Sequence, residues 1–181
     1  MKDNTVEIDH TVVPSRLNFA RKFNVAVPFI DEHVNQGRGH KAAIKTADIT
    51  WTYQDLYNHV NRVGKHLLAE GIKPGERLMM VVRDCPEFIA LFFGAIKAGI
   101  IPAPVNTLLR KEDYIYLISD CGCAGFIYSS QFSEILEPAV SACKHKSAYV
   151  STVETLFEQA GSCNGLLEPA ARTHLDDCFW L

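Results

Sequence analysis

The amino-acid sequence predicts an α/β fold in which a doubly wound, mostly parallel sheet is flanked by helices. Short apolar runs alternate along the chain with longer segments of helical periodicity. The run at 77–82 is continuously apolar after its first residue, as expected for a strand that is covered on both faces. Repeated β–α–β units of this size imply right-handed crossovers, and they imply ligand binding beyond the carboxyl ends of the strands.

The clearest helix is expected to begin after Thr52 and to stop at Gly71. Thr52 and Asp55 have the spacing of a capping box, although Asp is less favoured at the second position than Glu or Gln. Apolar residues then recur at helical spacing at Leu56, Val60, Val63 and Leu67. Gly64 lies on the same stripe, where it would let a neighbouring backbone approach closely.

A second helix is expected after Asp84, which can cap it, and before Gly99, which ends it. This helix is apolar nearly all round, so the sequence predicts that it is deeply buried. The strand at 100–105 contains Pro102 and Pro104, which have no N–H to donate to a sheet. We therefore expect a short strand or an edge strand there.

The first 25 residues are expected to form an extended lead-in, and residues 26–181 are expected to form one α/β subdomain. The other expected elements are a helix at 27–35, strands at 41–45 and 48–51, a helix at 111–120, a strand at 125–128, a helix at 132–143 interrupted near Pro138, a strand at 147–150 and a helix at 151–160. Ser151 and Glu154 give that last helix a second capping-box pattern. A loop-like segment then leads to a new apolar run at Phe179.

Composition excludes several classes of protein. The 181 residues suffice for one domain with a core, and 18 basic against 21 acidic residues give a net charge of −3. This balance does not favour nucleic acid as a partner. The first 15 residues lack the apolar core of a secretory signal, and no apolar stretch approaches the ~18 residues of a membrane span. We therefore expect a cytoplasmic protein without a membrane partner.

The sequence shows no metal site and no catalytic constellation. The spacing of the six cysteines fits no zinc pattern, because Cys121-Gly122-Cys123 is one residue too tight, and free, mostly buried thiols are expected. His59 and His66 share a helix, and exposed positions are expected for both. Neither Gly-x-x-x-x-Gly-Lys-Ser/Thr nor Gly-x-Gly-x-x-Gly occurs, and the glycine-rich stretch at 37–41 is interpreted as a surface turn.

Three segments resemble core motifs of the acyl-adenylate-forming enzymes, the AMP-dependent synthetase and ligase family. The segment 51–56 (Trp-Thr-Tyr-Gln-Asp-Leu) is similar to the family's first motif, and 71–77 (Gly-Ile-Lys-Pro-Gly-Glu-Arg) resembles its turn into a strand. The segment 94–106, with Lys97-Ala98-Gly99, looks like its second motif. Each motif alone is weak, but their order and spacing together are specific. The resemblance extends from about residue 25 to residue 181.

The end of the chain sharpens this resemblance. Phe179-Trp180-Leu181 looks like the approach to the family's phosphate loop in aryl-CoA ligases, and Asn106-Thr107-Leu108-Leu109 also resembles benzoate–CoA ligases. The resemblance implies a longer ligase that uses ATP, Mg²⁺ and coenzyme A to convert benzoate, or a close aryl relative, into its CoA thioester. It places the ATP-binding and catalytic residues beyond Leu181, so this chain is expected to be inactive and to bind no cofactor.

The family also implies a basic contact to the phosphates of CoA. Arg110, Lys111 and Arg83 are the candidates, against the simpler interpretation of solvated or local loop contacts. Partners would be a small carboxylic acid, ATP, CoA and the remainder of the same chain, and a homodimer stays open. Two alternatives remain: another adenylate-forming enzyme (a fatty-acyl or coumarate CoA ligase, a luciferase-like enzyme or a carrier-protein adenylation domain), or a non-enzymatic α/β module that binds a partner.

Overall fold

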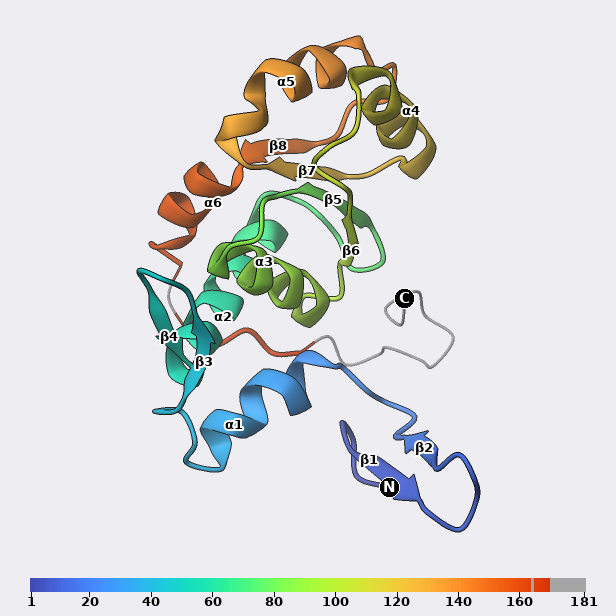
Figure 1. Ribbon diagram of the computed structural model, residues 1–181, viewed down its shortest axis with the longest axis vertical. Helices are drawn as coiled ribbons and strands as arrows, with labels where there is room; N and C mark the ends of the chain where they lie inside the picture. Colours follow the sequence, from blue (N-terminus) through green and yellow to red (C-terminus); the bar gives the residue numbers. More distant parts are fainter. Residues whose placement is uncertain (164, 170–181) are drawn as a thin grey trace.

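A four-stranded parallel sheet forms the centre of the computed structural model, which describes residues 1–163 and 165–169 (Figure 1). The strands follow the spatial order β6-β5-β7-β8, and every neighbouring pair is parallel. Their bounds are β5 Arg77–Val81, β6 Ile101–Pro104, β7 Gly125–Tyr128 and β8 Tyr149–Thr152.

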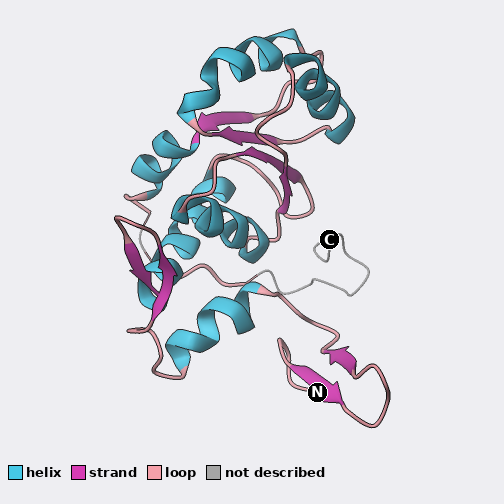
Figure 2. Cartoon of the chain, viewed as in Figure 1, coloured by secondary structure: helices cyan, strands magenta, loops and turns pink. Residues whose placement is uncertain are grey.

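Helices cover both faces of this sheet, which confirms the predicted doubly wound α/β fold (Figures 1 and 2). One face packs against α2 (Tyr53–Ala69), α3 (Pro86–Lys97) and α6 (Val153–Ala160). The other face packs against α4 (Lys111–Cys121) and α5 (Ser133–Ala142), which continues through Pro138 without the expected interruption.

The apolar run of β5 is explained by its central position. Leu78 and Met80 point into the cluster shared with α2, α3 and α6, whereas Met79 and Val81 point into the cluster shared with α4 and α5. All four side chains are at most 2% exposed. Successive side chains of a strand alternate between the two faces, so both faces must be apolar when both are covered.

Two predictions from glycine and proline are confirmed. A Cβ placed on Gly64 of α2 would lie 2.7 Å from the carbonyl oxygen of Gly94 in α3, so the two helix backbones do approach closely there. Among the described strands, β6, which contains Pro102 and Pro104, pairs only with β5 and forms an edge of the sheet.

Three predictions concern the residues that cap helix N-termini, of which one is confirmed and two are wrong. The Thr52–Asp55 capping box is present in full. The second predicted box is wrong, because β8 continues to Thr152 and the Thr152 hydroxyl accepts the Thr155 N–H at 3.2 Å. Asp84 does not cap α3 either: Cys85 is the N-cap residue, without a side-chain hydrogen bond.

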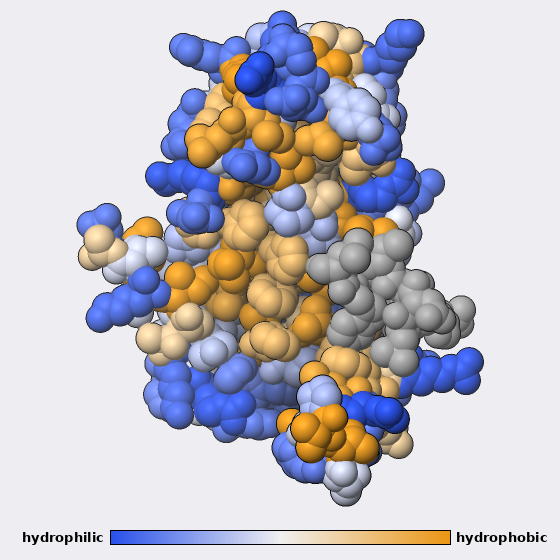
Figure 3. Space-filling view, turned by 45° about the vertical axis from the view of Figure 1, so that its right-hand side comes forward, coloured by the Kyte–Doolittle hydropathy of each residue, from blue (hydrophilic) through white to orange (hydrophobic). Residues whose placement is uncertain are grey.

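The prediction that α3 is deeply buried is confirmed for the side that packs on the sheet and α2, but it is wrong for the outer side. Phe88, Ile89, Phe92 and Phe93 are only half-buried. Within the described part of the chain, the sheet and α2 cover two sides of α3, and its outer side is covered only toward its carboxyl end, where Ile96 is 3% exposed. Figure 3 shows apolar side chains along the middle of the face on which α3 lies. Periodicity cannot reveal which sides of an apolar helix receive a partner.

The N-terminal part of the chain lies on the side of α2 and α3 (Figure 1). Within the expected lead-in, β1 and β2 form an antiparallel hairpin. The helix expected at 27–35 begins as one π-helical turn, η1, and continues as α1, and β3 and β4 form a second antiparallel pair. The bounds are β1 Val6–Asp9, β2 Arg16–Phe19, η1 Val27–Asp31, α1 Glu32–Asn35, β3 Ala42–Lys45 and β4 Thr50–Thr52. The predicted apolar run at 179–181 lies outside the described residues.

Candidate binding crevice

A crevice of about 630 Å³ opens at the carboxyl ends of β5, β6 and β7. Its lining combines polar groups with the apolar side chains of Phe88, Leu108 and Phe132. The polar residues of the lining are Arg83, Asp84, Asn106, Thr107 and Gln131. This crevice is the place where a doubly wound sheet binds ligands.

The path of the chain explains the crevice. The segment after β5 turns into α3 on one face of the sheet, whereas the segment after the adjacent strand β7 turns into α5 on the other face. Connections that leave neighbouring strands in opposite directions cannot fill the space between them. The 3₁₀ turn η2 (Ser130–Phe132) then supplies one wall of the crevice.

A buried serine fixes the two strand ends that border the crevice. Ser129 is 0% exposed, and its hydroxyl accepts the backbone N–H of Arg83 at 3.0 Å. The backbone N–H of Ser129 in turn donates to the Val81 carbonyl oxygen at 3.1 Å. These two bonds join the ends of β5 and β7, so the position of Arg83 is set by buried hydrogen bonds.

Arg83 is the sequence-predicted residue that the structure brings into the crevice. Among the described residues, no hydrogen bond or ion pair engages its guanidinium. Arg83 also lines a second hollow of about 390 Å³, between α2, α3 and α6, together with His59 and Cys85. It therefore stands between the two hollows, at an exposed position.

The other two predicted residues lie elsewhere. Arg110 is the N-cap residue of α4, and its backbone N–H donates to the Asp113 carboxylate at 3.1 Å. Lys111 is the first residue of that helix. Both follow the loop that leaves β6, but neither lines the crevice. Their proposed contact with CoA stays a prediction.

Sequence reasoning missed the polar residues Asn106, Thr107 and Gln131. Asn106 is held in place, because its carbonyl oxygen accepts the Tyr114 hydroxyl at 3.0 Å and its side chain accepts the Leu108 N–H at 2.9 Å. A usable signal was present, since these residues follow strands β6 and β7 directly and the carboxyl ends of parallel strands meet at one edge of the sheet.

The histidines of α2 do not occupy the exposed positions that the sequence favoured. The His59 ring stacks on Trp51 with ring centroids 4.3 Å apart, and burial lowers its pKa, so it is neutral at pH 7. His66 is 6% exposed, and its Nε2 lies 3.0 Å from the Tyr149 hydroxyl. Helix α2 packs against α3, α6, β4, β3, η1 and α1, which leaves little open surface for either ring.

The cysteines are free, as expected, among the described residues. Cys123 and Cys143 are buried, whereas Cys85, Cys121 and Cys163 are half-buried, and Cys178 lies outside the described residues. Burial raises the pKa of Cys85, beside the crevice, to about 11, so it is a neutral thiol at pH 7. Cys85 is thus not an activated nucleophile.

A buried ion pair includes Lys97 of the second family motif. The ammonium of Lys97, 1% exposed, lies 2.8 Å from Asp31 and 4.9 Å from the centroid of the Tyr57 ring. Burial raises the pKa of Asp31 above its ordinary value, although Lys97 opposes this effect. The pair joins η1 to α3, and its role is to hold the N-terminal segment in place.

Neither a metal centre nor a membrane-spanning helix occurs in the part of the chain that the structure describes. Over residues 1–163 and 165–169, no group of three His, Cys, Asp or Glu side chains is placed to hold a metal ion. In the same part of the chain, no helix is both long and apolar enough to cross a membrane. The crevice offers a guanidinium, the Asp84 carboxylate, amides, a hydroxyl and aromatic rings as its recognition groups.

Comparison with known proteins identifies the family of this chain. The profile of the AMP-binding enzymes matches residues 30–178. The chain is 37% identical over 125 residues to a 4-hydroxybenzoate–CoA/benzoate–CoA ligase of Rhodopseudomonas palustris, covering 69% of this chain and 23% of that protein. It is 30% identical over 185 residues to a benzoate–CoA ligase of Thauera aromatica, covering 96% of this chain and 34% of that protein.

Solved structures agree with these sequence matches. The anthranilate CoA ligase AuaEII, solved with anthranoyl-AMP, superposes with a TM-score of 0.79 at 26% identity, covering 88% of this chain and 31% of that one. A benzoate CoA ligase from Burkholderia xenovorans LB400 gives a TM-score of 0.73 at 26% identity, with 86% and 31% covered. The chain thus spans 23–34% of the length of these relatives. It belongs to the AMP-binding, acyl-adenylate-forming enzyme family, and it is similar to the benzoate–CoA ligases within it.

Proposed function

We propose that this chain is the N-terminal part of an aryl-acid–CoA ligase. The complete enzyme would convert benzoate, ATP and CoA into benzoyl-CoA, AMP and pyrophosphate by way of an acyl-adenylate. The observation that carries the proposal is the crevice at the carboxyl ends of β5, β6 and β7, in a chain related to two ligases of benzoate. A free carboxylate is a poor electrophile, and adenylation gives it a good leaving group.

Within this reaction the chain would supply scaffold and a contact for the phosphates of CoA. The guanidinium of Arg83 suits a phosphate, because it is permanently charged and can donate bidentate hydrogen bonds. Phe88, Phe132 and Leu108 offer apolar surface in the same crevice for the uncharged parts of the molecule. Arg110 and Lys111 remain candidates for a second phosphate contact at the start of α4.

The ATP phosphates, Mg²⁺ and the acyl group would be handled by residues that follow this part of the family fold. We therefore expect the isolated chain to form no acyl-CoA. We also expect the enzyme to act in the cytoplasm, where ATP and CoA are available, and a homodimer remains open.

The reaction is tested on the full-length protein that carries this chain. Pyrophosphate release is measured with benzoate, hydroxybenzoates and aliphatic acids, and the thioester products are identified by mass. We expect the highest kcat/KM with benzoate or a close aryl acid, and no product from the isolated chain. A preference for long-chain acids would reject the aryl assignment but keep the ligase chemistry.

A specific observation supports that second candidate. The chain is 30% identical over 92 residues to a long-chain-fatty-acid–CoA ligase of Mycobacterium tuberculosis, covering 51% of this chain. The match is shorter than those to the benzoate ligases, so the aryl acid is the preferred substrate class.

The CoA contact is tested on the full-length protein by calorimetric titration with CoA. We expect Arg83→Ala to weaken binding about tenfold, the effect of losing one charge-assisted contact of ~1.5 kcal/mol. Lys73→Ala is the matched control, because it removes a cation in the turn before β5, at the opposite end of the sheet. If Arg110→Ala or Lys111→Ala lost affinity for CoA and Arg83→Ala did not, the phosphate contact would be assigned to the start of α4.

A further inference from the structure

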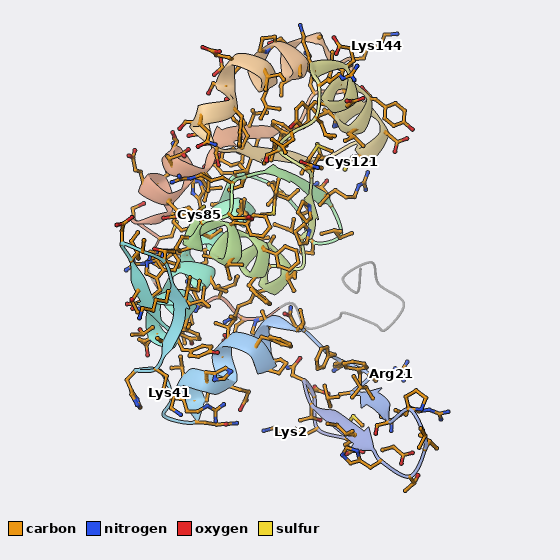
Figure 4. All side chains as sticks on the ribbon, viewed as in Figure 1. Lys2, Arg21, Lys41, Cys85, Cys121 and Lys144 are labelled. Atoms are coloured by element: carbon orange, nitrogen blue, oxygen red, sulfur yellow. The ribbon has the colours of Figure 1, made fainter. Side chains whose placement is uncertain are left out.

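The Cys-Gly-Cys segment at 121–123 plays no part in the proposed ligase site. Cys121 ends α4, Gly122 is its left-handed C-cap with φ 54° and ψ 44°, and Cys123 lies two residues before β7. Figure 4 shows Cys121 beside α4 at one end of the sheet and Cys85 nearer the other end. The segment is thus at the amino end of β7, away from the crevice.

Covalent geometry permits a bond between the two thiols. Two residues span at most about 7 Å, and a disulfide needs Cα atoms about 4.4–6.8 Å apart. The left-handed glycine bends the chain, so the separation is shorter than the extended limit. Both side chains pack against the same apolar cluster between the sheet and helices α4 and α5, so they leave the backbone toward the same side.

Side chains at the start of β5 and just before β8 hold the backbone of this segment through hydrogen bonds. The Arg77 guanidinium donates to the Cys121 carbonyl oxygen at 2.9 and 3.0 Å and to that of Gly122 at 3.2 Å. The Cys123 carbonyl oxygen accepts the Ser147 hydroxyl at 2.9 Å and lies 2.8 Å from Nε2 of His145. These hydrogen bonds therefore fix the turn that carries the two thiols.

The two thiols differ in access, which gives them different roles. Cys121 is half-buried, so a small molecule in solution can reach it. Cys123 is 0% exposed, so it can be reached only from its neighbour. Burial and the Cys123 thiol raise the pKa of Cys121, and the Arg77 guanidinium opposes that rise. Cys121 is therefore mostly a neutral thiol at pH 7, and its attack depends on the thiolate fraction, which grows as the pH rises.

We propose that Cys121 and Cys123 form a reversible oxidation site that takes low-molecular-weight disulfides such as oxidised glutathione. The Cys121 thiolate attacks one sulfur of the oxidant, which forms a mixed disulfide and releases one glutathione thiol. Cys123 then loses its proton and attacks the Cys121 sulfur, which releases the second glutathione thiol. Two protein thiols are oxidised by two electrons, the oxidant is reduced to two thiols, and these carry the two protons.

The bond should also be easy to reduce. A ring closed across one residue departs from relaxed disulfide geometry, and such bonds have more oxidising potentials. The site would therefore respond to the surrounding thiol–disulfide balance instead of forming a permanent structural bridge. It does not depend on the proposed ligase function.

The experiment exposes the folded chain to oxidised glutathione at pH 8, blocks free thiols with iodoacetamide and digests it after glutamate residues. Cleavage after Glu112 and Glu134 yields the peptide 113–134, whose only cysteines are Cys121 and Cys123. We expect this peptide to be two hydrogens lighter than its reduced form and unalkylated, and dithiothreitol treatment to restore both alkylation sites.

Variants distinguish oxidation of the Cys121–Cys123 pair from general oxidation of thiols. Cys123→Ser should retain glutathione on Cys121, because the resolving thiol is gone, whereas Cys121→Ser should leave Cys123 reduced. Cys143→Ser is the matched control and should leave the pair unchanged, since Cys143 Sγ donates to the Ala139 carbonyl oxygen and is buried. Full alkylation of peptide 113–134 in the oxidised wild-type chain would overturn the proposal, as would linkage of either cysteine to a third one.

Discussion

The two faces of the central sheet are packed in different ways. On the face of α2 and α3, two glycines bring the helix backbones together, and a buried ion pair fixes the segment that lies over α3. On the face of α4 and α5, large side chains such as Tyr114 and Phe126 fill the space. The first face therefore depends on the lack of side chains at Gly64 and Gly94, and it should tolerate substitution less well than the second.

The largest effect is expected at the buried ion pair. Asp31→Ala leaves the ammonium of Lys97 buried without its partner, which typically costs about 3–5 kcal/mol. Urea denaturation at pH 7 measures the free energy of unfolding. The cation–π contact with Tyr57 remains in this variant and limits the loss.

The control for this variant removes both charges. Asp31→Leu combined with Lys97→Met should recover most of the lost stability, because a buried ion pair can be replaced by apolar side chains at little cost. If the double variant were as unstable as Asp31→Ala, the loss would come from packing and not from an unpaired charge.

The next effect concerns the close approach of α2 and α3. Gly64→Val places side-chain carbon against the Gly94 carbonyl oxygen, so the helices must separate, and overpacking of this kind costs about 1–3 kcal/mol. Asn58→Val is the matched control, because it introduces the same side chain at an exposed position of α2. Equal midpoints of thermal unfolding for the two variants would show that the contact can relax without cost.

On the second face, a smaller loss is expected from Tyr114→Phe. The change keeps the packed ring and removes the hydroxyl that donates to the Asn106 carbonyl oxygen, a loss of about 1 kcal/mol. Tyr116→Phe, at a position 66% exposed, should be neutral. Because Asn106 lines the crevice, Tyr114→Phe should also weaken CoA binding. An unchanged affinity would show that the hydrogen bond from α4 does not affect the crevice.

The contrast between the faces also explains which features the sequence could predict. Helix periodicity, glycine stops and the prolines of β6 act within one element, so the fold class and the Gly64 contact followed from them. Asp31 and Lys97 are 66 residues apart, and neither carries a local signal for the other. The crevice residues Asn106 and Gln131 become neighbours only through the strand order, which periodicity does not specify.

The smallest effect is local, at the start of α2, and it depends on pH. Hydrogen bonds from the Thr52 hydroxyl and N–H, at 2.7 and 2.9 Å, lower the pKa of Asp55 below its ordinary value of 3.8. The native state therefore favours the carboxylate, and its contribution to stability is present above pH 3.8 and is lost as the pH falls through the lower native pKa. Asp55→Asn should cost about 1 kcal/mol at pH 7, with the difference from wild type shrinking below pH 3.8.

Urea denaturation across this pH range measures the effect of Asp55→Asn on the free energy of unfolding. Asp48→Asn, in the exposed turn between β3 and β4, removes the same charge outside a cap and should show no such difference at either pH. Since the cap satisfies helix N–H groups without touching α3, Asp55→Asn and Gly64→Val should add when combined. A combined loss well below the sum would mean that the start of α2 and its contact with α3 form one cooperative unit, and that the glycine face is sensitive along the whole helix.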